Sequence, residues 1–302
     1  MILKDVCEEF IIYIKSVRGL SENTVTGYTK DLEHLCEILG DDAPIDNVSS
    51  EDLRLCIAKL SDAKMAVTSV NRFIAAVRTL FSYARRFGYI LKNPALEIKT
   101  LKAPKYMPKF LTSPEIDSLC KAPEKNELLW KTRDKALFEM MYSSGCRVSE
   151  IISLKISDLE NGNSSAIVTG KGKKDRRVFF EEDAKKALDD YLNDRKNRFQ
   201  NQAEGDCPYL FVNQNGTHLT SGGVRYILSR YSGEEGINHH INPHAIRHTF
   251  ATSMLSNGAD VRYIQEMLGH SSINITEIYT HVAVAKQRDI LLSKHPRKNF
   301  NV

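Results

Sequence analysis

The amino-acid sequence predicts a mainly α-helical protein of two lobes, with one small β-hairpin or sheet in the second lobe. The chain has 302 residues, which exceeds one typical domain. Apolar residues recur at three- and four-residue spacing through the N-terminal third of the chain, as they do along amphipathic helices. The clearest β-prone runs flank a turn rich in glycine and lysine near residue 170.

The N-terminal third is expected to form a bundle of four helices joined by short loops. Gly19, Gly40 and Gly88 supply helix stops, because glycine readily adopts the conformation that ends a helix. Serines precede the second and third helices as caps. The expected helices cover residues 2–17, 21–39, 50–60 and 68–87.

Positive charge is concentrated in one part of the chain, although the net charge is only +4. Residues 1–69 hold seven Lys and Arg against thirteen Asp and Glu, whereas residues 70–110 hold nine against Glu97 alone. This asymmetry is larger than that of an ordinary solvated helix face, and it predicts contact with nucleic acid. The DNA-contact candidates are Arg72, Arg78, Arg85, Arg86, Lys102 and Lys105, with Lys173 and Lys174 from the later turn.

Residues 97–110, which follow Asn93-Pro94, contain prolines and lysines and show no sustained helical or strand periodicity. Such a segment is typical of an interdomain linker. We therefore expect a helical, nucleic-acid-binding domain at 1–100, a basic linker at 101–111 and a larger second domain at 112–302.

The second lobe is expected to begin with a capped helix at Thr112-Ser113-Pro114-Glu115. Two β-prone runs bracket Gly170-Lys171-Gly172, where small residues let the backbone approach a phosphate closely. The β-prone runs are residues 166–169 and 177–180, a short strand is expected at 209–212, and further helices are expected at about 128–143, 183–201, 221–231 and 284–292.

Arg147 is expected at a junction between two helices. Gly145 should end one helix and Ser149 or a neighbour should begin the next, which leaves the Arg147 side chain able to reach a ligand. An ion pair with Glu150 is the alternative interpretation.

Residues 243–282 hold the strongest concentration of reactive side chains and are expected to form one short helical run. Proline suits a first helical turn, so His244 and Arg247 should share one face near the positive N-terminus, where anions are stabilised. An arginine fork and nearby histidines, including His270, suit the charge of a phosphoryl-transfer site, and Tyr279 is the candidate nucleophile.

Zinc binding by His244 and His248 is the competing interpretation of this helix. The two histidines are four residues apart, but Ala245 stands where a metalloprotease helix needs glutamate. We therefore expect no metal and no other cofactor. The six cysteines include no C-x-x-C pair, which makes them more typical of small core residues than of a zinc knuckle or a disulfide framework.

No apolar run approaches 18 residues, and the N-terminus has no signal-peptide pattern. These features predict an intracellular protein, and the basic segment suggests a cytoplasmic, nucleoid-associated location.

At this point the chain resembles the tyrosine recombinases, most closely the Xer-type site-specific recombinases. Their signatures H-x-x-R-H, L-G-H and I-Y-T-H are matched by residues 244–248, 268–270 and 278–281. Their first arginine box, T-G-x-R-x-S-E, is matched by residues 144–150, with Ser144 for threonine and Cys146 where leucine is more usual. The resemblance covers nearly the whole chain.

The resemblance implies a C-shaped clamp around duplex DNA and conservative strand exchange that needs neither metal nor ATP. Tyr279 would form a 3′-phosphotyrosine, and Lys171, with Lys173 as the competing assignment, would serve as the hairpin lysine. The implied catalytic set is Arg147, Lys171, His244, Arg247, His270 and Tyr279.

The implied biological role is resolution of chromosome or plasmid dimers by a homo- or hetero-tetramer on two duplexes, with a second recombinase or a DNA-translocase activator as further partners. A mobile-element integrase and a catalytically silent DNA-binding protein are the alternatives. A type IB topoisomerase shares the chemistry, but the spacing favours recombination. A metal-dependent nuclease needs clustered carboxylates, and Asp260, Glu266 and Glu277 lack ligand spacing.

The C-terminal tail carries an apolar patch from Val282 to Leu292, followed by a basic stretch at 294–298. Because the patch follows Tyr279 so closely, we expect it to dock on a neighbouring subunit rather than fold back on its own lobe. Packing against its own lobe is the alternative.

Overall fold

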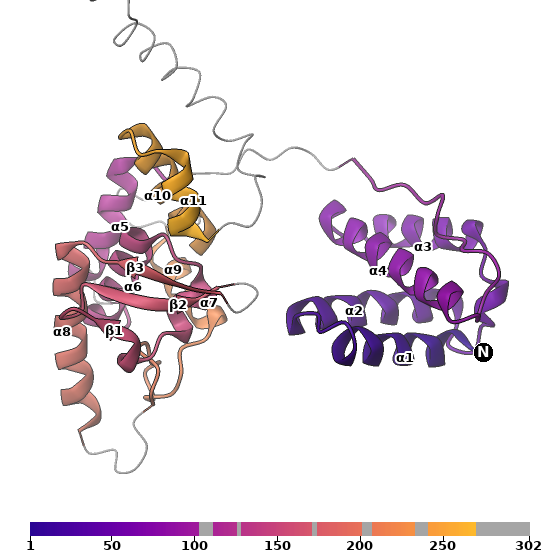
Figure 1. Ribbon diagram of the computed structural model, residues 1–302, viewed down its shortest axis with the longest axis horizontal. Helices are drawn as coiled ribbons and strands as arrows, with labels where there is room; N and C mark the ends of the chain where they lie inside the picture. Colours follow the sequence, from indigo (N-terminus) through magenta and orange to yellow (C-terminus); the bar gives the residue numbers. More distant parts are fainter. Residues whose placement is uncertain (103–110, 126–127, 171–173, 201–206, 233–240, 270–302) are drawn as a thin grey trace, which may run out of the picture. The chain divides into compact units, whose positions relative to one another are not determined.

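The computed structural model describes residues 1–302 except 103–110, 126–127, 171–173, 201–206, 233–240 and 270–302 (Figure 1). The chain divides into two compact units, Met1–Tyr106 and Met107–Val302. Helices dominate both units and the second contains a small sheet, which confirms the predicted fold class. Among the described residues, no helix is both long enough and apolar enough to cross a membrane.

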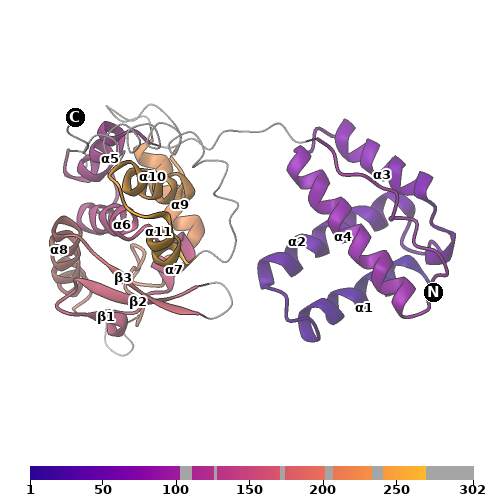
Figure 2. The ribbon, with the colours of Figure 1, turned by 45° about the horizontal axis from the view of Figure 1, so that its top comes forward.

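The N-terminal unit is a bundle of four α-helices, as the apolar spacing predicted (Figures 1 and 2). Helix α4 packs against the other three helices, and its buried face includes Phe73, Val77 and Leu80. The helices are α1 (Leu3–Ser16), α2 (Glu22–Leu39), α3 (Ser50–Asp62) and α4 (Val67–Arg86), with a short 3-10 helix η1 (Ile45–Asn47).

The second unit is built around α6, which packs against α5, α8 and α10 and is buried on most sides. Figure 2 shows α10 and α11 beside α9 and α7, at the end of the unit away from β1. The helices are α5 (Ser113–Lys125), α6 (Lys131–Ser144), α7 (Val148–Ser153), α8 (Glu182–Phe199), α9 (Ser221–Tyr231), α10 (Pro243–Ser256) and α11 (Val261–Leu268), with a 3-10 helix η2 (Ile156–Asp158).

The sheet of this unit is antiparallel, in the order β1-β2-β3. Strands β2 (Ser165–Thr169) and β3 (Asp175–Phe179) form the predicted hairpin, with Val168 opposite Arg176 and Thr169 opposite Asp175. Strand β1 (Leu159–Glu160) adds an edge that the sequence did not predict. Because strand residues alternate between faces, Arg176 shares the face of buried Val178.

Two expectations about this unit were wrong. Residues 209–212 form no regular strand; they make single bridges from Tyr209 to Lys155 and from Val212 to His218. The described part of 243–282 is two helices rather than one helical run, because Gly258 has a φ of 101° and breaks the chain direction between α10 and α11.

Candidate active site around Glu150

The start of α10 positions two of the predicted catalytic residues. The Asn242 side chain accepts a hydrogen bond from the Ala245 amide at 2.9 Å, and Pro243 occupies the first helical position. His244 and Arg247 then lie three residues apart on one face. His244 is exposed, whereas only 7% of Arg247 is exposed.

Gly145 brings the junction between α6 and α7 against this helix. It ends α6 with a φ of 60°, and its amide donates to the carbonyl of Met141 at 3.1 Å. A Cβ at this position would lie 2.3 Å from the Phe250 ring and 2.9 Å from Leu268. Any side chain here would therefore push α10 and α11 away from Arg147.

Arg147 and Arg247 converge on the C-terminal end of α11. Arg247 donates from Nη1 to the carbonyl of Gly145 at 2.8 Å and from Nη2 to that of Leu268 at 2.6 Å. Arg147 donates from Nη2 to the carbonyl of Gly269 at 3.5 Å. The two arginines thus bind carbonyl groups that the helix end leaves open.

Glu150 lies at the centre of the arginines. Its Oε1 is 2.8 Å from Nη1 of Arg147, and its two oxygens accept hydrogen bonds from Arg176 at 2.9 and 2.8 Å. Nη1 of Arg247 is 3.8 Å from Oε2. The alternative interpretation of Arg147, an ion pair with Glu150, is therefore observed, and the pair holds the guanidinium at the junction.

The charge balance of this cluster favours an anion. One carboxylate, with 3% of its side chain exposed, faces three guanidinium groups. Burial alone would raise the pKa of Glu150, but hydrogen bonds from Arg176 and from the Arg147 amide outweigh it and lower the pKa to about 2. Burial, followed by the charge of Arg147, lowers the pKa of Arg247 to about 10. An added anion would relieve this excess of positive charge.

His244 lies in the same positive field. Partial removal from water lowers the pKa of its imidazole, and the charges of Arg247, Arg225 and Arg147 lower it further. A neutral imidazole can accept a proton from a reacting group, which is the property required of a general base.

Arg176 is the residue of this site that the sequence interpretation missed. Besides its paired bonds to Glu150, it donates from Nε to the carbonyl of Met267 at 2.7 Å. Gly269, with a φ of 63°, leaves room for its guanidinium; a Cβ there would lie 3.2 Å from Nη1 of Arg176. Period-two alternation from buried Val178 is the sequence signal that could have placed Arg176 inward.

Four residues predicted for the catalytic site, counting the alternative Lys173, lie outside the described residues. Lys171 and Lys173 belong to the segment between the paired Thr169 and Asp175, and His270 and Tyr279 follow the end of α11. The described structure therefore brings Arg147 and Arg247 together around Glu150. His244 lies close enough for the charges of both arginines to lower its pKa.

The DNA-contact candidates of the N-terminal unit differ in their surroundings. Arg72 forms a bidentate pair with Asp31 at 2.8 and 3.0 Å, and that carboxylate is almost fully buried. Arg78 donates to the carbonyl of Ile98, and Arg86 donates to the Tyr13 hydroxyl at 3.4 Å. Arg72 and Arg78 thus also hold their own unit together.

The other candidates lie outside such pairs or outside the described residues. Arg85 and Lys102 are exposed, Lys174 is exposed at the start of β3 in the second unit, and Lys105 lies outside the described residues.

In the described part of the chain, no group of three or more His, Cys, Asp or Glu side chains is placed so that it could hold a metal ion. Asp260, one of the carboxylates considered for a nuclease, instead caps α11 by accepting a hydrogen bond from the Arg262 amide at 2.7 Å.

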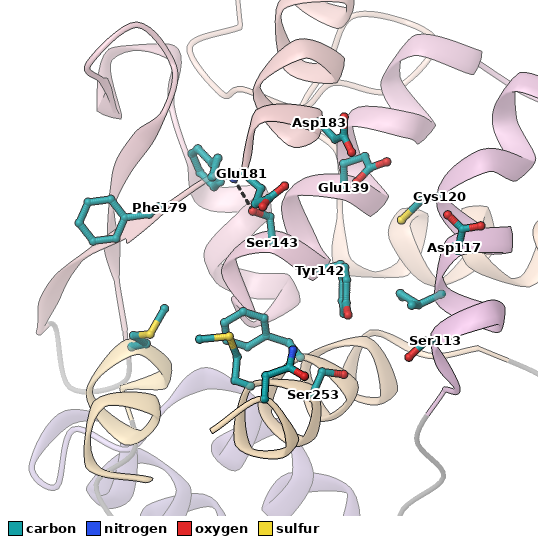
Figure 3. A pocket seen from close by; sticks show the side chains of 16 residues that line it. Ser113, Asp117, Cys120, Glu139, Tyr142, Ser143, Phe179, Glu181, Asp183 and Ser253 are labelled. Carbon is teal, nitrogen blue, oxygen red and sulfur yellow. Dashed lines mark hydrogen bonds between the residues drawn. The ribbon is translucent and has the colours of Figure 1, made fainter. Parts of the chain in front are cut away.

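A cavity of about 630 Å³ adjoins this site, between α5, α6, β3, α10 and α11 (Figure 3). Its lining includes apolar side chains, among them Phe250 and Met267. Its remaining lining includes four carboxylates, and burial followed by the charge of Asp183 raises the pKa of Glu139. The carboxylates are those of Asp117, Glu139, Glu181 and Asp183.

Comparisons with known proteins show the family of the chain. The Phage integrase family profile matches residues 109–286, and the profile of the phage integrase N-terminal SAM-like domain matches residues 7–88. Tyrosine recombinase XerC of Treponema denticola is 39% identical over 97% of this chain and 99% of its own length. Tyrosine recombinase XerD of Oceanobacillus iheyensis is 36% identical over 96% of this chain and 98% of its own length.

Solved structures show the same fold. A crystal structure of XerA recombinase matches at 29% identity with a TM-score of 0.53, covering 97% of this chain and 99% of that one. The Tn1549 transposon integrase in complex with transposon right end DNA matches at 20% identity with a TM-score of 0.78, covering 97% and 100%. The chain therefore belongs to the phage integrase family and is a tyrosine recombinase, an enzyme of site-specific DNA cleavage and rejoining, as its motifs predicted.

Proposed function

We propose that this enzyme resolves chromosome or plasmid dimers by conservative strand exchange at a specific DNA site, in the cytoplasm and in association with the nucleoid. The observation that carries the proposal is the cluster of Arg147, Arg176 and Arg247 around the single carboxylate of Glu150, which leaves an excess of positive charge for a phosphodiester. The near full-length similarity to proteins named XerC and XerD supports the role in dimer resolution.

In this proposal Tyr279 attacks the phosphorus in line, which gives a 3′-phosphotyrosine and a free 5′-hydroxyl. Arg147 and Arg247, with His270, bind the non-bridging oxygens where negative charge develops. The two guanidinium groups are preorganised, because Glu150 and the carbonyl groups of Gly145, Leu268 and Gly269 already fix their direction.

Two further residues move protons. Lys171 protonates the leaving 5′-oxygen, and His244 accepts a proton at the phosphate or tyrosine. The lowered pKa of His244 supports this assignment, because the imidazole is then available as a base at neutral pH. The 5′-hydroxyl of a partner strand reverses the chemistry, so the bond energy is conserved in the phosphotyrosine.

The two units have separate tasks in this proposal. Residues 1–100 bind DNA and residues 112–302 carry the chemistry, while the basic segment 101–111 connects them so that they close on a duplex as a clamp. Exposed Arg85 and Lys102 are the best placed to meet phosphates, since Arg72, Arg78 and Arg86 have partners within their own unit.

Strand exchange requires several subunits on two duplexes, either copies of this chain or this chain with a second recombinase. The cavity beside the site provides a docking place for the C-terminal segment of a neighbouring subunit. Its apolar and acidic lining residues match a segment that is apolar at 282–292 and basic at 294–298.

The test of this function begins with mapping the genomic DNA that the protein protects. A plasmid dimer that carries two copies of that site should be resolved to monomers by the enzyme, alone or with a second recombinase. Insertion of a circular element at the site, without resolution of dimers, would instead indicate a mobile-element integrase.

A further inference from the structure

Two cysteines from neighbouring helices meet in the N-terminal unit. Cys7 of α1 and Cys36 of α2 have Sγ atoms 3.9 Å apart, within S–H···S hydrogen-bond distance, although they are 29 residues apart in the sequence. A disulfide bond is ~2.05 Å long, so the two sulfur atoms need to approach by roughly 2 Å to form one. Nothing in the cysteine spacing along the chain indicates this pairing.

The pair is close to solvent without being exposed. Both cysteines line a cavity of about 510 Å³ between α1 and α2, which also includes Lys4 and Asp41. Their exposed fractions are 6% and 8%, whereas Cys56 in the same core is 0% exposed. A small oxidant can therefore enter the cavity and reach the pair more readily than it can reach Cys56.

The surroundings give the two thiols different reactivity. The hydrogen bond between the two sulfur atoms lowers the pKa of Cys36, and this effect outweighs burial and the charge of Asp41, which both raise it. The same hydrogen bond, together with burial, raises the pKa of Cys7. Since the thiolate is the nucleophilic form, Cys36 is the thiol that an oxidant meets first and Cys7 is the thiol that resolves the product.

We propose that Cys7 and Cys36 form a reversible dithiol–disulfide pair that protects the N-terminal unit against irreversible oxidation by peroxides. The Cys36 sulfur attacks one oxygen of hydrogen peroxide, the O–O bond breaks, and a sulfenic acid and one water are formed. The Cys7 sulfur then attacks the Cys36 sulfur, and the S–O bond breaks to release a second water. The two thiols lose two electrons, which the peroxide gains, and a cellular dithiol reductant reverses the reaction.

The burial of Cys36 explains why a resolving thiol beside it would protect the N-terminal unit. Without a resolving thiol, Cys36 would proceed to a sulfinic acid, which places a charged group where only 8% of the residue is exposed. The disulfide adds no charge, and it joins helices α1 and α2 that already pack together. It also restricts the unfolded chain, so the oxidised unit should be more stable to heat than the reduced unit.

The experiment uses the full-length reduced protein, treated with hydrogen peroxide under native conditions. Remaining thiols are blocked with N-ethylmaleimide in denaturant, and proteolytic peptides are analysed by mass spectrometry. We expect the peptide with Cys7 joined to the peptide with Cys36, and the link should disappear after dithiothreitol. A Cys56→Ser control should give the same link, whereas Cys7→Ser should give none and should accumulate sulfinic acid on Cys36.

Thermal unfolding supplies a second measurement. Oxidised wild type should melt several degrees above reduced wild type, and reductant should remove the difference. The proposal is overturned if wild-type Cys36 reaches sulfinic acid without any link to Cys7, or if the link forms only after the protein is unfolded. The wild-type peptide map decides this even if Cys7→Ser folds poorly.

Discussion

The carboxylate of Glu150 should contribute strongly to the stability of the second unit, and replacing it with an amide tests the architecture of the site. Glu150→Gln keeps the side-chain size but removes the charge that faces Arg147, Arg176 and Arg247. The oxygen of the glutamine amide cannot match the charge-assisted hydrogen bonds that the carboxylate accepts from these arginines. The NH₂ group of the amide is itself a donor and would face the N–H donors of the guanidinium groups. Three guanidinium groups are then left without their shared counter-charge.

Two independent arguments give the same magnitude for the stability that Glu150→Gln should lose. Breaking a buried ion pair by removing one partner typically costs about 3 to 5 kcal/mol. The pKa of Glu150 falls from 4.5 to about 2 in the folded protein. That difference corresponds to roughly 3 kcal/mol of stability, which is fully present above the unfolded pKa and is lost as pH falls toward the folded pKa.

The assay is urea denaturation followed by fluorescence of Trp130, because the chain has one tryptophan and it is buried in the second unit. We expect Glu150→Gln to lower the free energy of unfolding by about 3 kcal/mol at pH 7, and the gap to wild type should narrow below about pH 4.5. Glu160→Gln, which removes the surface partner of Arg177, is the matched control and should cost less than about 1 kcal/mol. The reasoning would be refuted if the two substitutions lowered the free energy of unfolding equally. It would also be refuted if the difference between Glu150→Gln and wild type did not change with pH.

Three further predictions concern catalysis and assembly. Arg147→Lys and Arg247→Lys should each lower the rate of DNA cleavage by roughly a hundred- to a thousandfold, because an ammonium cannot reproduce the guanidinium fork; full activity in a cleavage assay would remove that role. Cleavage should continue in EDTA, since arginines and Lys171 take the place of metal ions, and a loss that magnesium restores would indicate a nuclease mechanism. Deleting residues from Ala283 onward should preserve binding to a single site but impair synapsis in a gel-shift assay; wild-type recombination by the truncated protein would exclude the donated tail.

The fold was predictable where local signals were strong. Helices α2 and α4 lie within a residue or two of the expected ranges, because a serine caps the start of α2, apolar spacing marks α4, and a glycine follows the end of each. Residues 209–212 are β-prone, yet they make single bridges, from Val212 to nearby His218 and from Tyr209 to distant Lys155, and no local pattern reveals the contact with Lys155. Strand β1 is two residues long, which is too short to carry any periodic signal.

The residues of the site also differ in how far they could be predicted from the sequence. Arg147, Arg247 and His244 stand in recognisable motifs, and their chemistry is visible from residue type. The role of Glu150 as a shared counter-charge, and the entry of Arg176 from β3, depend on the register that places Arg176 opposite Val168. Likewise, the internal pairing of Arg72 follows from Asp31 on another helix, so a charge count alone could not separate structural arginines from exposed ones.

The central claim is that Tyr279 is the nucleophile that attacks the phosphate bound by Arg147 and Arg247. A nicked suicide substrate carrying the mapped site should trap wild-type protein as a covalent complex on a denaturing gel. Tyr279→Phe should bind the same DNA with near-wild-type affinity yet form no covalent complex, while Tyr263→Phe, at an exposed position of α11, should be trapped like wild type. Covalent trapping of Tyr279→Phe at the wild-type level would contradict the claim.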